Sequence, residues 1–292
     1  MTTLRVAVDY ELLDCGDGRR LERFGAYRLD RPAPAAIEPP RLDTRAWASA
    51  DGRYERAGDG GRWRWRDVPP APWPAAVNGL TFELRPANGG QVGLFPEQLP
   101  IWVWIGDQVR TAIADVIRPS DASPEVLNLF AFTGGATLAA ARAGGRVTHV
   151  DAARDAVGSA RRNAEFSGLA DRPIRWLVDD AETFVRREIR RGRSYDGVIL
   201  DPPSYGHGPH GRSWRLAERL DELLTSVARL VSERNGFIIL TAHASEIGPH
   251  DLRAAVLRAV DRRCESGRLE ILASSGARLP LGAYARVARG LR

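Results

Sequence analysis

The pattern of apolar and polar residues divides the chain into two parts that meet near Pro86. Before Pro86, short apolar segments such as YELLDCGDG, RRLERFGAYRLDRP, GRWRWRDVP and NGLTFELRP are interrupted by polar residues. The Asp17-Gly18 and Asn78-Gly79 pairs are typical of tight hairpin turns. This pattern predicts a small β-rich N-terminal domain over residues 1–86.

The character of the chain changes after Pro86, where residues 87–123 form a predicted connector and leading helix. The segment ANGGQVGLFPEQ is glycine-rich, and LPIWVWIGDQVRTAIADVIRP follows it. In that second segment apolar residues recur at helical spacing. They are Trp102, Ile105, Val109, Ala112 and Val116.

Strand and helix signals alternate over residues 124–292, the predicted third region. Apolar runs typical of buried strands, among them VLNLFA, RVTHVDA, YDGVILDPP and GFIILTAHAS, are each followed by a helical segment. Such alternation needs crossovers between parallel strands and therefore predicts a doubly wound α/β sheet. The tail LEILASSGARLPLGAYARVARG shows two strands without a helix between them, so we expect an antiparallel pair that closes the sheet edge.

Composition and charge narrow the class of protein only a little. The net charge is +5, the pI is about 9.7, and all 42 cationic residues are arginine. Arginine binds phosphate well, so RNA is a candidate partner, although a GC-rich coding sequence would produce the same excess. Two cysteines are too few for a disulfide scaffold or a cysteine-built metal site. Without an apolar run of roughly 20 residues or a signal peptide, the expected location is the cytoplasm, away from membranes.

Two tryptophans alternate with arginines in GRWRWRDV. The period of two places Trp63 and Trp65 on one strand face and Arg62, Arg64 and Arg66 on the other. An aromatic and basic surface for RNA is one interpretation. We favour the other, in which the tryptophans pack and the arginines are solvated.

A glycine turn follows the first strand of the predicted sheet. Thr133-Gly134-Gly135 precedes a helix of small residues and lets the backbone approach a ligand at the helix N-terminus. The Gly-x-Gly-x-x-Gly fingerprint of dinucleotide sites is missing, and Phe130 and Phe132 occupy positions that a pyrophosphate turn keeps open. The loop therefore suits a nucleoside cofactor without pyrophosphate and disfavours a nicotinamide dehydrogenase.

Acidic residues end the next two strands. Asp151 stands where a carboxylate can bind ribose hydroxyls. Asp179 and Asp180 precede a helix, where they can bond an adenine amino group or cap that helix. Their shared place at the carboxyl edge, beside the glycine turn, favours the cofactor interpretation.

The strand in YDGVILDPPSY ends abruptly at Asp201. Two consecutive prolines cannot continue a ladder because each lacks a backbone N–H, so their carbonyls can accept hydrogen bonds from a ligand. Ligands bind at this edge of open α/β sheets. We expect Asp201, Pro202 and Tyr205 to contact the molecule that reacts.

Together the segments VLNLFAFTGGATLAAARAGGRVTHVDAARDAV, LVDDAETF and VILDPPSY resemble bacterial class I S-adenosylmethionine-dependent methyltransferases of 23S ribosomal RNA bases, which make 5-methylcytosine or 7-methylguanine. The resemblance runs from about Leu94 to Ser245 and implies a Rossmann-like sheet of seven strands. It also implies S-adenosylmethionine along the first strands and the acceptor at the Asp-Pro-Pro loop. The implied cofactor residues are Asn128, Phe130, Thr133, Gly134, Asp151, Asp180 and Asp201, with Asp179 beside them and Gln98 on the cofactor or the acceptor.

The acceptor atom is predicted from an absent cysteine. Methylation of a cytosine ring carbon needs a cysteine that first adds to the ring. The resemblance to the family implies this cysteine in a segment at the end of the fifth strand, where this chain has Ala244, and Ser204 follows the two prolines. We therefore expect a nitrogen acceptor held by Asp201, Pro202 and Tyr205. His243 is either a base or a packed core residue. The pair His207 and His210 lacks companion ligands, so no metal is predicted.

The leading hypothesis is a methyltransferase that uses S-adenosylmethionine and acts on a base nitrogen of ribosomal RNA. A methyltransferase for a small heterocyclic metabolite is the second, because cofactor motifs do not define the acceptor. The third is a non-catalytic RNA-binding relative.

Overall fold

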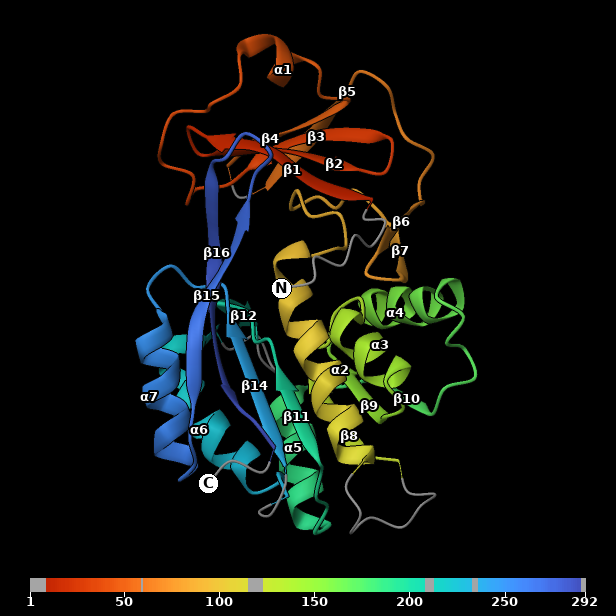
Figure 1. The fold of residues 1–292 in the computed structure, drawn as a ribbon, viewed down its shortest axis with the longest axis vertical. Coiled ribbons are helices and arrows are strands. Elements are labelled where there is room, and N and C mark those ends of the chain that lie inside the picture. Colours follow the sequence, from red (N-terminus) through yellow and green to blue (C-terminus); the bar gives the residue numbers. More distant parts are fainter. Residues whose placement is uncertain (1–8, 59, 115–122, 208–212, 233–235, 290–292) are drawn as a thin grey trace. The chain divides into compact units, whose positions relative to one another are not determined.

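The computed structural model describes residues 9–58, 60–114, 123–207, 213–232 and 236–289 and is drawn in Figure 1. These residues form two compact units. The first runs to Leu99 and includes Arg162–Ser167 and Glu270–Leu281, and the second contains the rest. The domain boundaries at residues 86 and 123 stay a prediction.

The first unit is β-rich, as predicted. A five-stranded sheet has the order β1-β2-β3-β4-β5, with β3 and β4 parallel and the other pairs antiparallel. Its strands are β1 (Tyr10–Gly16), β2 (Arg19–Phe24), β3 (Tyr27–Pro32), β4 (Gly52–Ala57) and β5 (Gly60–Trp65). Helix α1 (Thr44–Ala48) lies between β3 and β4 in the chain, and β6 (Trp73–Val77) and β7 (Leu80–Leu84) form a separate hairpin.

Both predicted tight turns of the first unit are confirmed by their backbone. The φ angles are 50° at Asp17 and 73° at Gly18, and 52° at Asn78 and 70° at Gly79. Left-handed conformations at both central residues suit the twist of a two-residue hairpin. These turns fix how β1 meets β2 and how β6 meets β7.

The tryptophans of β5 lie on one face of the strand, as the sequence predicts. Trp63 and Trp65 stack with ring centroids 5.0 Å apart, and Tyr54 meets Trp63 edge-on at 5.4 Å. Both tryptophans are half-buried, whereas Arg62 and Arg64 are exposed. The Trp63 indole N–H also donates to the Ala87 carbonyl, which favours the packing interpretation over an open RNA surface.

A seven-stranded mixed sheet organises the second unit, with the order β10-β9-β8-β11-β14-β16-β15. The adjoining ends of β15 and β16, within Glu270–Leu281, belong to the first unit. The strands from β10 to β14 are parallel, and β16 runs antiparallel to β14. This confirms the doubly wound sheet and its antiparallel C-terminal pair. The strands are β8 (Glu125–Leu129), β9 (Arg146–Asp151), β10 (Ile174–Val178), β11 (Gly197–Leu200), β14 (Phe237–Ala242), β15 (Glu265–Leu272) and β16 (Arg278–Val287).

Helices cover both faces of this sheet (Figure 1). They are α2 (Leu99–Ile113), which follows the short 3-10 helix η1 (Pro96–Gln98), and then α3 (Gly135–Arg142), α4 (Arg154–Phe166), α5 (Ala181–Arg190), α6 (Leu216–Ala228) and α7 (Pro249–Ala259). One apolar cluster joins α2 and α3 to the sheet, and another joins α5, α6 and α7 to it.

Strand β11 shows how the sequence separates the two clusters. Val198 and Leu200 belong to the cluster under α5, α6 and α7, whereas Ile199 belongs to the cluster under α2 and α3. Successive side chains of a strand point to opposite faces, so a continuous apolar run is needed where both faces are covered. The apolar residues that the sequence places at helical spacing from Trp102 to Ala112 are buried, while Val116 lies outside the described residues.

A chain of buried polar side chains connects β8, α3 and β9. The Asn128 amide donates to the Thr137 hydroxyl at 2.9 Å, and that hydroxyl lies 2.9 Å from Nδ1 of His149. His149 is fully buried, its ring lies 4.8 Å from that of Trp176, and burial lowers its pKa to about 3. The imidazole is therefore neutral in the folded protein at any pH near 7.

We expect this histidine to make folding sensitive to mild acid. Between pH 6.5 and about 3, His149 is protonated in the unfolded chain but stays neutral in the folded chain. The free energy of unfolding should fall by up to about 1.4 kcal/mol per pH unit on acidification through that range. Urea titrations across pH should show a shallower dependence for His149→Gln. The exposed His250→Gln is the matched control, and equal slopes for both variants would contradict the prediction.

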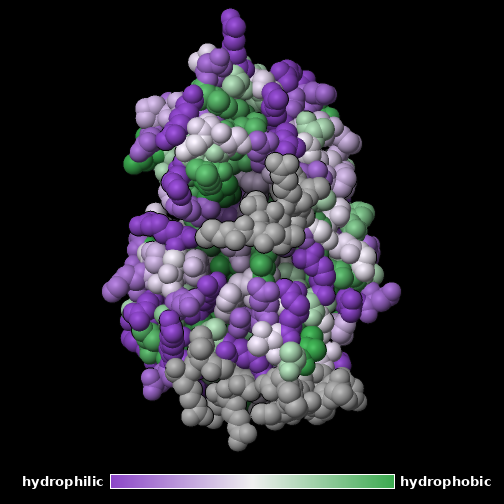
Figure 2. Space-filling model, in the orientation of Figure 1, coloured by the Kyte–Doolittle hydropathy of each residue, from purple (hydrophilic) through white to green (hydrophobic). Residues whose placement is uncertain are grey.

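The surface in Figure 2 shows hydrophilic side chains over most of the viewed face, with apolar ones in small groups between them. In the described ranges, no helix is both long enough and apolar enough to cross a membrane.

Candidate active site at the carboxyl ends of the strands

The loop after β8 has an unusual backbone. Phe130, Phe132 and Gly134 have φ angles of 55°, 47° and 90°. Positive φ is uncommon outside glycine and costs free energy, so surrounding contacts must hold the loop. The Phe132 N–H donates to a carboxylate oxygen of Asp151 at 2.8 Å, and the Ala131 N–H donates to the Val150 carbonyl at 3.1 Å.

The two glycines of this loop serve different purposes. Gly134 needs the left-handed conformation, and a Cβ there would lie 3.0 Å from Cβ of Ala160. Gly135 begins α3, where a Cβ would lie 2.1 Å from the Trp102 ring. The second glycine thus lets α3 pack directly on α2.

Gly135→Ala should therefore destabilise the protein, because a core tryptophan must move to admit the methyl group. Overpacking of this kind costs about 1–3 kcal/mol. Thermal or urea unfolding measures the loss. Gly89→Ala is the control, since a Cβ at Gly89 meets nothing within 4 Å, and equal stability of the two variants would contradict the prediction.

Asp151 ends β9 and holds the backbone on both sides of itself. One carboxylate oxygen accepts the Phe132 N–H, and the other accepts the Ala153 N–H at 2.8 Å. Burial raises the pKa of this carboxyl above its ordinary value of 3.8, although the two N–H groups oppose the shift. An ionised carboxylate has about four lone-pair sites, so two hydrogen bonds leave capacity for ribose hydroxyls.

The adjacent acids after β10 are engaged in local structure. An Asp180 carboxylate oxygen accepts the Thr183 N–H at 2.8 Å and caps α5. The Asp179 carboxylate pairs with Arg187, and the Asp179 N–H donates to the Asp151 carbonyl at 3.0 Å. The structure thus shows the capping role for Asp180, and contacts of both acids with a cofactor stay predictions.

The other predicted cofactor residues lie in different settings. Thr133 is half-buried in the loop, whereas Asn128 is buried and its amide bonds Thr137. Gln98 is buried in η1, which belongs to the first unit. The structure therefore brings together Phe130, Thr133, Gly134 and Asp151, and the contact expected of Gln98 stays a prediction.

The Asp-Pro-Pro loop leaves the sheet at the end of β11. Oδ1 of Asp201 accepts a hydrogen bond from the Thr241 hydroxyl at 2.6 Å and lies 3.4 Å from Nε2 of His243. Asp201 and His243 have side chains 33% and 28% exposed, so both reach the surface of the site. Pro202 is buried and Pro203 exposed. The carboxylate is thus held from β14 at the edge of the sheet.

A short hairpin follows the prolines, formed by β12 (Tyr205–His207) and β13 (Ser213–Arg215). Tyr205 is 65% exposed, and the Arg215 guanidinium carbon lies 5.6 Å from the centre of its ring. On this hairpin Trp214 donates its indole N–H to Glu182 at 2.9 Å. His210 lies outside the described residues.

Sequence reasoning missed the partners of the predicted residues. Thr241 holds Asp201, and Trp214 and Glu182 fasten the hairpin. Thr241 stands at the end of an apolar strand paired with β11, which is a signal that points to the same edge. The pairing of Trp214 with Glu182 spans 32 positions and leaves no local pattern in the sequence.

Both cysteines are poor candidates for nucleophiles. Cys15 and Cys264 are buried, and burial raises the pKa of each thiol. Ala244 is likewise buried in the apolar cluster under α7. Among the described residues, no group of three or more histidine, cysteine or acidic side chains is arranged to hold a metal ion.

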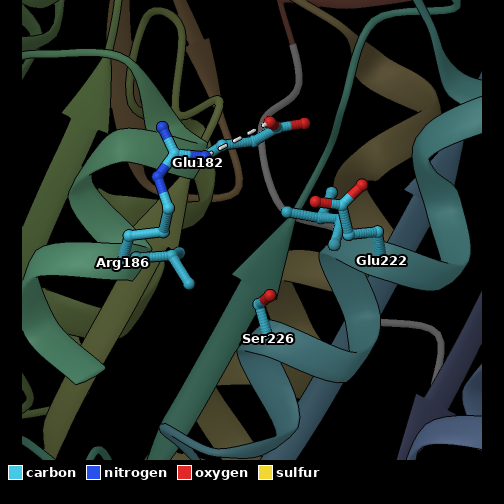
Figure 3. A pocket seen from close by; sticks show the side chains of 6 residues that line it. Glu182, Arg186, Glu222 and Ser226 are labelled. Carbon is cyan, nitrogen blue, oxygen red and sulfur yellow. Dashed lines mark ion pairs between the residues drawn. The ribbon is translucent and has the colours of Figure 1, made fainter. Parts of the chain in front are cut away.

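A pocket lies between α5 and α6 and is lined by side chains of both helices, with Glu182 and Arg186 opposite Glu222 and Ser226 (Figure 3). None of the predicted cofactor or acceptor residues lines it. We therefore place the candidate site at the strand ends and not between these helices.

The parallel sheet, its antiparallel edge and the glycine turn after the first strand together define the class I methyltransferase fold. A family described as "Conserved hypothetical protein 95" matches residues 105–242. The SAM-dependent methyltransferase from Agrobacterium tumefaciens is 34% identical and superposes with a TM-score of 0.87 over 96% of this chain and 90% of that one. The chain therefore belongs to the S-adenosylmethionine-dependent methyltransferase family.

Other relatives are more distant or match only in part. SMU.776, a putative methyltransferase complexed with SAH, shares the fold with a TM-score of 0.75 at 18% identity, over 96% of this chain and 76% of that one. Ribosomal RNA large subunit methyltransferase I of Klebsiella pneumoniae is 29% identical over 140 residues, and that of Pseudoalteromonas translucida 30% over 142. Each match covers 48% of this chain, and it spans only 32% and 33% of these relatives' length.

Proposed function

We propose that this protein transfers a methyl group from S-adenosylmethionine to a base nitrogen of ribosomal RNA. One observation carries the proposal. Strand β8 lies between β9 and β11 in the sheet, and the loop that follows it contains residues with positive φ. Asp151 ends β9 on one side of this loop, and Asp201 follows β11 on the other. A cofactor loop thereby stands between a carboxylate suited to ribose and a carboxylate suited to an acceptor.

The residues on the cofactor side fit a nucleoside with a short charged tail. Asp151 binds the ribose hydroxyls, and the turn at Thr133 and Gly134 presents backbone to the amino-acid end of the cofactor. The sulfonium supplies a methyl group that is already activated, so the protein mainly positions the acceptor and excludes water. The close approach of α3 to α2 at Gly135 keeps the turn in place.

The acceptor side carries the complementary groups. The Asp201 carboxylate accepts a hydrogen bond from the N–H of the base, while the Pro202 carbonyl offers a second acceptor. Thr241 fixes the carboxylate by donating to Oδ1. Tyr205 presents an exposed ring on which a flipped or single-stranded base can stack.

Three observations favour nitrogen over ring carbon. The two thiols are buried, their pKa values are raised, and alanine stands at the apparent cysteine position, residue 244. The thiolate is the nucleophile in carbon methylation, so a buried neutral thiol cannot serve.

The choice of RNA as substrate rests on two supports. The curated relatives are named as ribosomal RNA methyltransferases, and the chain carries a net charge of +5. The proposed location is the cytoplasm, where ribosomal RNA is available. A small heterocyclic acceptor is the alternative, since the cofactor residues do not select between them.

The decisive experiment is nucleoside mass spectrometry of ribosomal RNA from cells that lack this protein. We expect the loss of one methylated nucleoside, with the methyl group on nitrogen, and its return when the gene is restored. An unchanged profile would overturn RNA as the acceptor. Calorimetry with S-adenosylmethionine tests the cofactor separately, and absence of binding to the purified protein would overturn the methyltransferase itself.

A further inference from the structure

The β12–β13 hairpin presents two faces with different chemistry. Tyr205 pairs with Arg215 across the hairpin, so their side chains share one face. Trp214 is adjacent to Arg215 in the strand and therefore points to the opposite face. One face of the hairpin thus carries an aromatic ring and a cation, and the other carries an indole.

The indole face is fastened to the cofactor side of the site. Trp214 donates to Glu182 at 2.9 Å, and its ring centroid lies 5.9 Å from that of Phe130 in the cofactor loop. Arg219 donates to the same glutamate at 2.8 Å. Burial opposes ionisation of Glu182, but these hydrogen bonds prevail and lower its pKa, so the anchor is a carboxylate at neutral pH.

The base of the hairpin is also tied to the acceptor loop. The Leu216 N–H donates to the Ser204 carbonyl at 3.1 Å, directly after the two prolines. Glu182, which anchors the hairpin, is the second residue of α5 and lines the pocket of Figure 3. The hairpin that carries Tyr205 and Arg215 is therefore bonded both to α5 and to the loop that follows Asp201.

The opposite face is exposed and suited to a nucleotide. Arg215 lies over the Tyr205 ring, its side chain is 58% exposed, and its guanidinium lies 3.9 Å from the Glu218 carboxylate. An exposed ion pair at that distance contributes little to stability, so a phosphate can replace Glu218 as the partner of Arg215 at little cost. A guanidinium offers several N–H donors that match phosphate oxygens, and an aromatic ring stacks on any base.

We propose that Arg215 binds a backbone phosphate of the RNA acceptor while the target base stacks on Tyr205. The inference rests on the proposed function and extends it to a residue that selects a polynucleotide over a small uncharged heterocycle. Arg215 contributes to substrate binding and takes no part in the methyl transfer itself.

The test compares Arg215→Gln with Arg258→Gln. Arg258 is also 58% exposed and also paired with a carboxylate, Asp221 at 2.6 Å, but it lies on α7. Methyl transfer to an unmodified in vitro transcript of 23S ribosomal RNA gives kcat and KM for each. For Arg215→Gln we expect KM to rise roughly tenfold with little change in kcat, and partial recovery in Arg215→Lys. Arg258→Gln should match the wild type.

The salt dependence of RNA binding gives an independent measure. Loss of one phosphate contact should reduce the slope of log affinity against log salt by roughly 0.7 in Arg215→Gln alone. Equal KM values and equal slopes in the two variants would overturn the inference while leaving the proposed function intact. A wild-type protein that binds S-adenosylmethionine but methylates no RNA would overturn RNA as the acceptor and, with it, the role of Arg215.

Discussion

Asp151→Ala is expected to lower the affinity for S-adenosylmethionine by about 100-fold or more. The substitution would remove the proposed hydrogen bonds that the ribose hydroxyls donate to the carboxylate, each contributing about 1.5–3 kcal/mol. It also releases the Phe132 N–H, which Asp151 accepts at 2.8 Å and which helps to hold the left-handed loop. Calorimetric titration with the cofactor measures the loss.

Two variants separate the ribose role from a general loss of structure. Asp151→Asn keeps one acceptor oxygen and the size of the side chain, so we expect an intermediate affinity. Asp155→Ala removes an exposed carboxylate four positions away in α4 and should bind like the wild type. If Asp151→Ala bound as tightly as Asp155→Ala, the carboxylate would have no part in the cofactor site.

The raised pKa of Asp151 predicts how the same binding changes with pH. The ionised carboxylate is the form that accepts ribose hydroxyls, so affinity should fall as this group becomes protonated. Because burial places its pKa above the ordinary 3.8, the fall should begin at a higher pH than a solvent-exposed aspartate would give. Titrations on the acid side should show this dependence in the wild type and lose it in Asp151→Asn. An identical pH profile for both would refute the assignment.

Asp201→Asn is expected to lower kcat by about 100-fold or more while cofactor binding changes little. The amide has the size of the carboxylate and can still accept from Thr241. It lacks the negative charge that, in the proposed function, holds the acceptor N–H and takes up its proton. Single-turnover methylation of the RNA transcript measures the rate, and calorimetry measures cofactor affinity. Loss of cofactor binding in proportion to the rate would instead place Asp201 on the cofactor.

The control for Asp201→Asn is Asp221→Asn on α6. The Asp221 carboxylate is 62% exposed, pairs with Arg258 and lies outside the strand-end site. We expect its kcat to match the wild type. A comparable loss in both variants would mean that the effect of Asp201→Asn is one of stability.

The sequence predicted the second unit well because its central strands are buried on both faces. The runs Gly197–Leu200 and Phe237–Leu240 are entirely apolar, which is the pattern of a strand covered on both sides. Helix α6 follows the first run after the β12–β13 hairpin, and α7 follows β14. In the first unit, β4 and β6 were missed. Strand β4 buries only Gly52 and Tyr54, and β6 contains Pro74, so neither shows a clear strand pattern.

The candidate site was predictable where chemistry follows directly from a strand end. Asp151 and Asp201 stand at such ends: Asp151 bonds the loop after β8, and Asp201 directly follows the strand paired with β8. The positions of Thr241, Trp214 and Glu182 depend on which strands and helices become neighbours, and no local spacing encodes that. The capping role of Asp180 was one of two alternatives, and the hydrogen bond from Thr183 shows it.

The place of β16 in the sheet has a consequence for synthesis. This strand, Arg278–Val287, lies between β14 and β15, although both precede it in the chain. A Cβ at Gly282 of β16 would lie 2.3 Å from the Ala242 carbonyl and 3.3 Å from the His243 ring, so this strand packs closely against the neighbour of Asp201. On the ribosome, strands β8, β9 and β10 can therefore pair before β16 has been synthesised. The end of β14 beside Asp201 gains this packing only after Arg278–Val287 has left the exit tunnel.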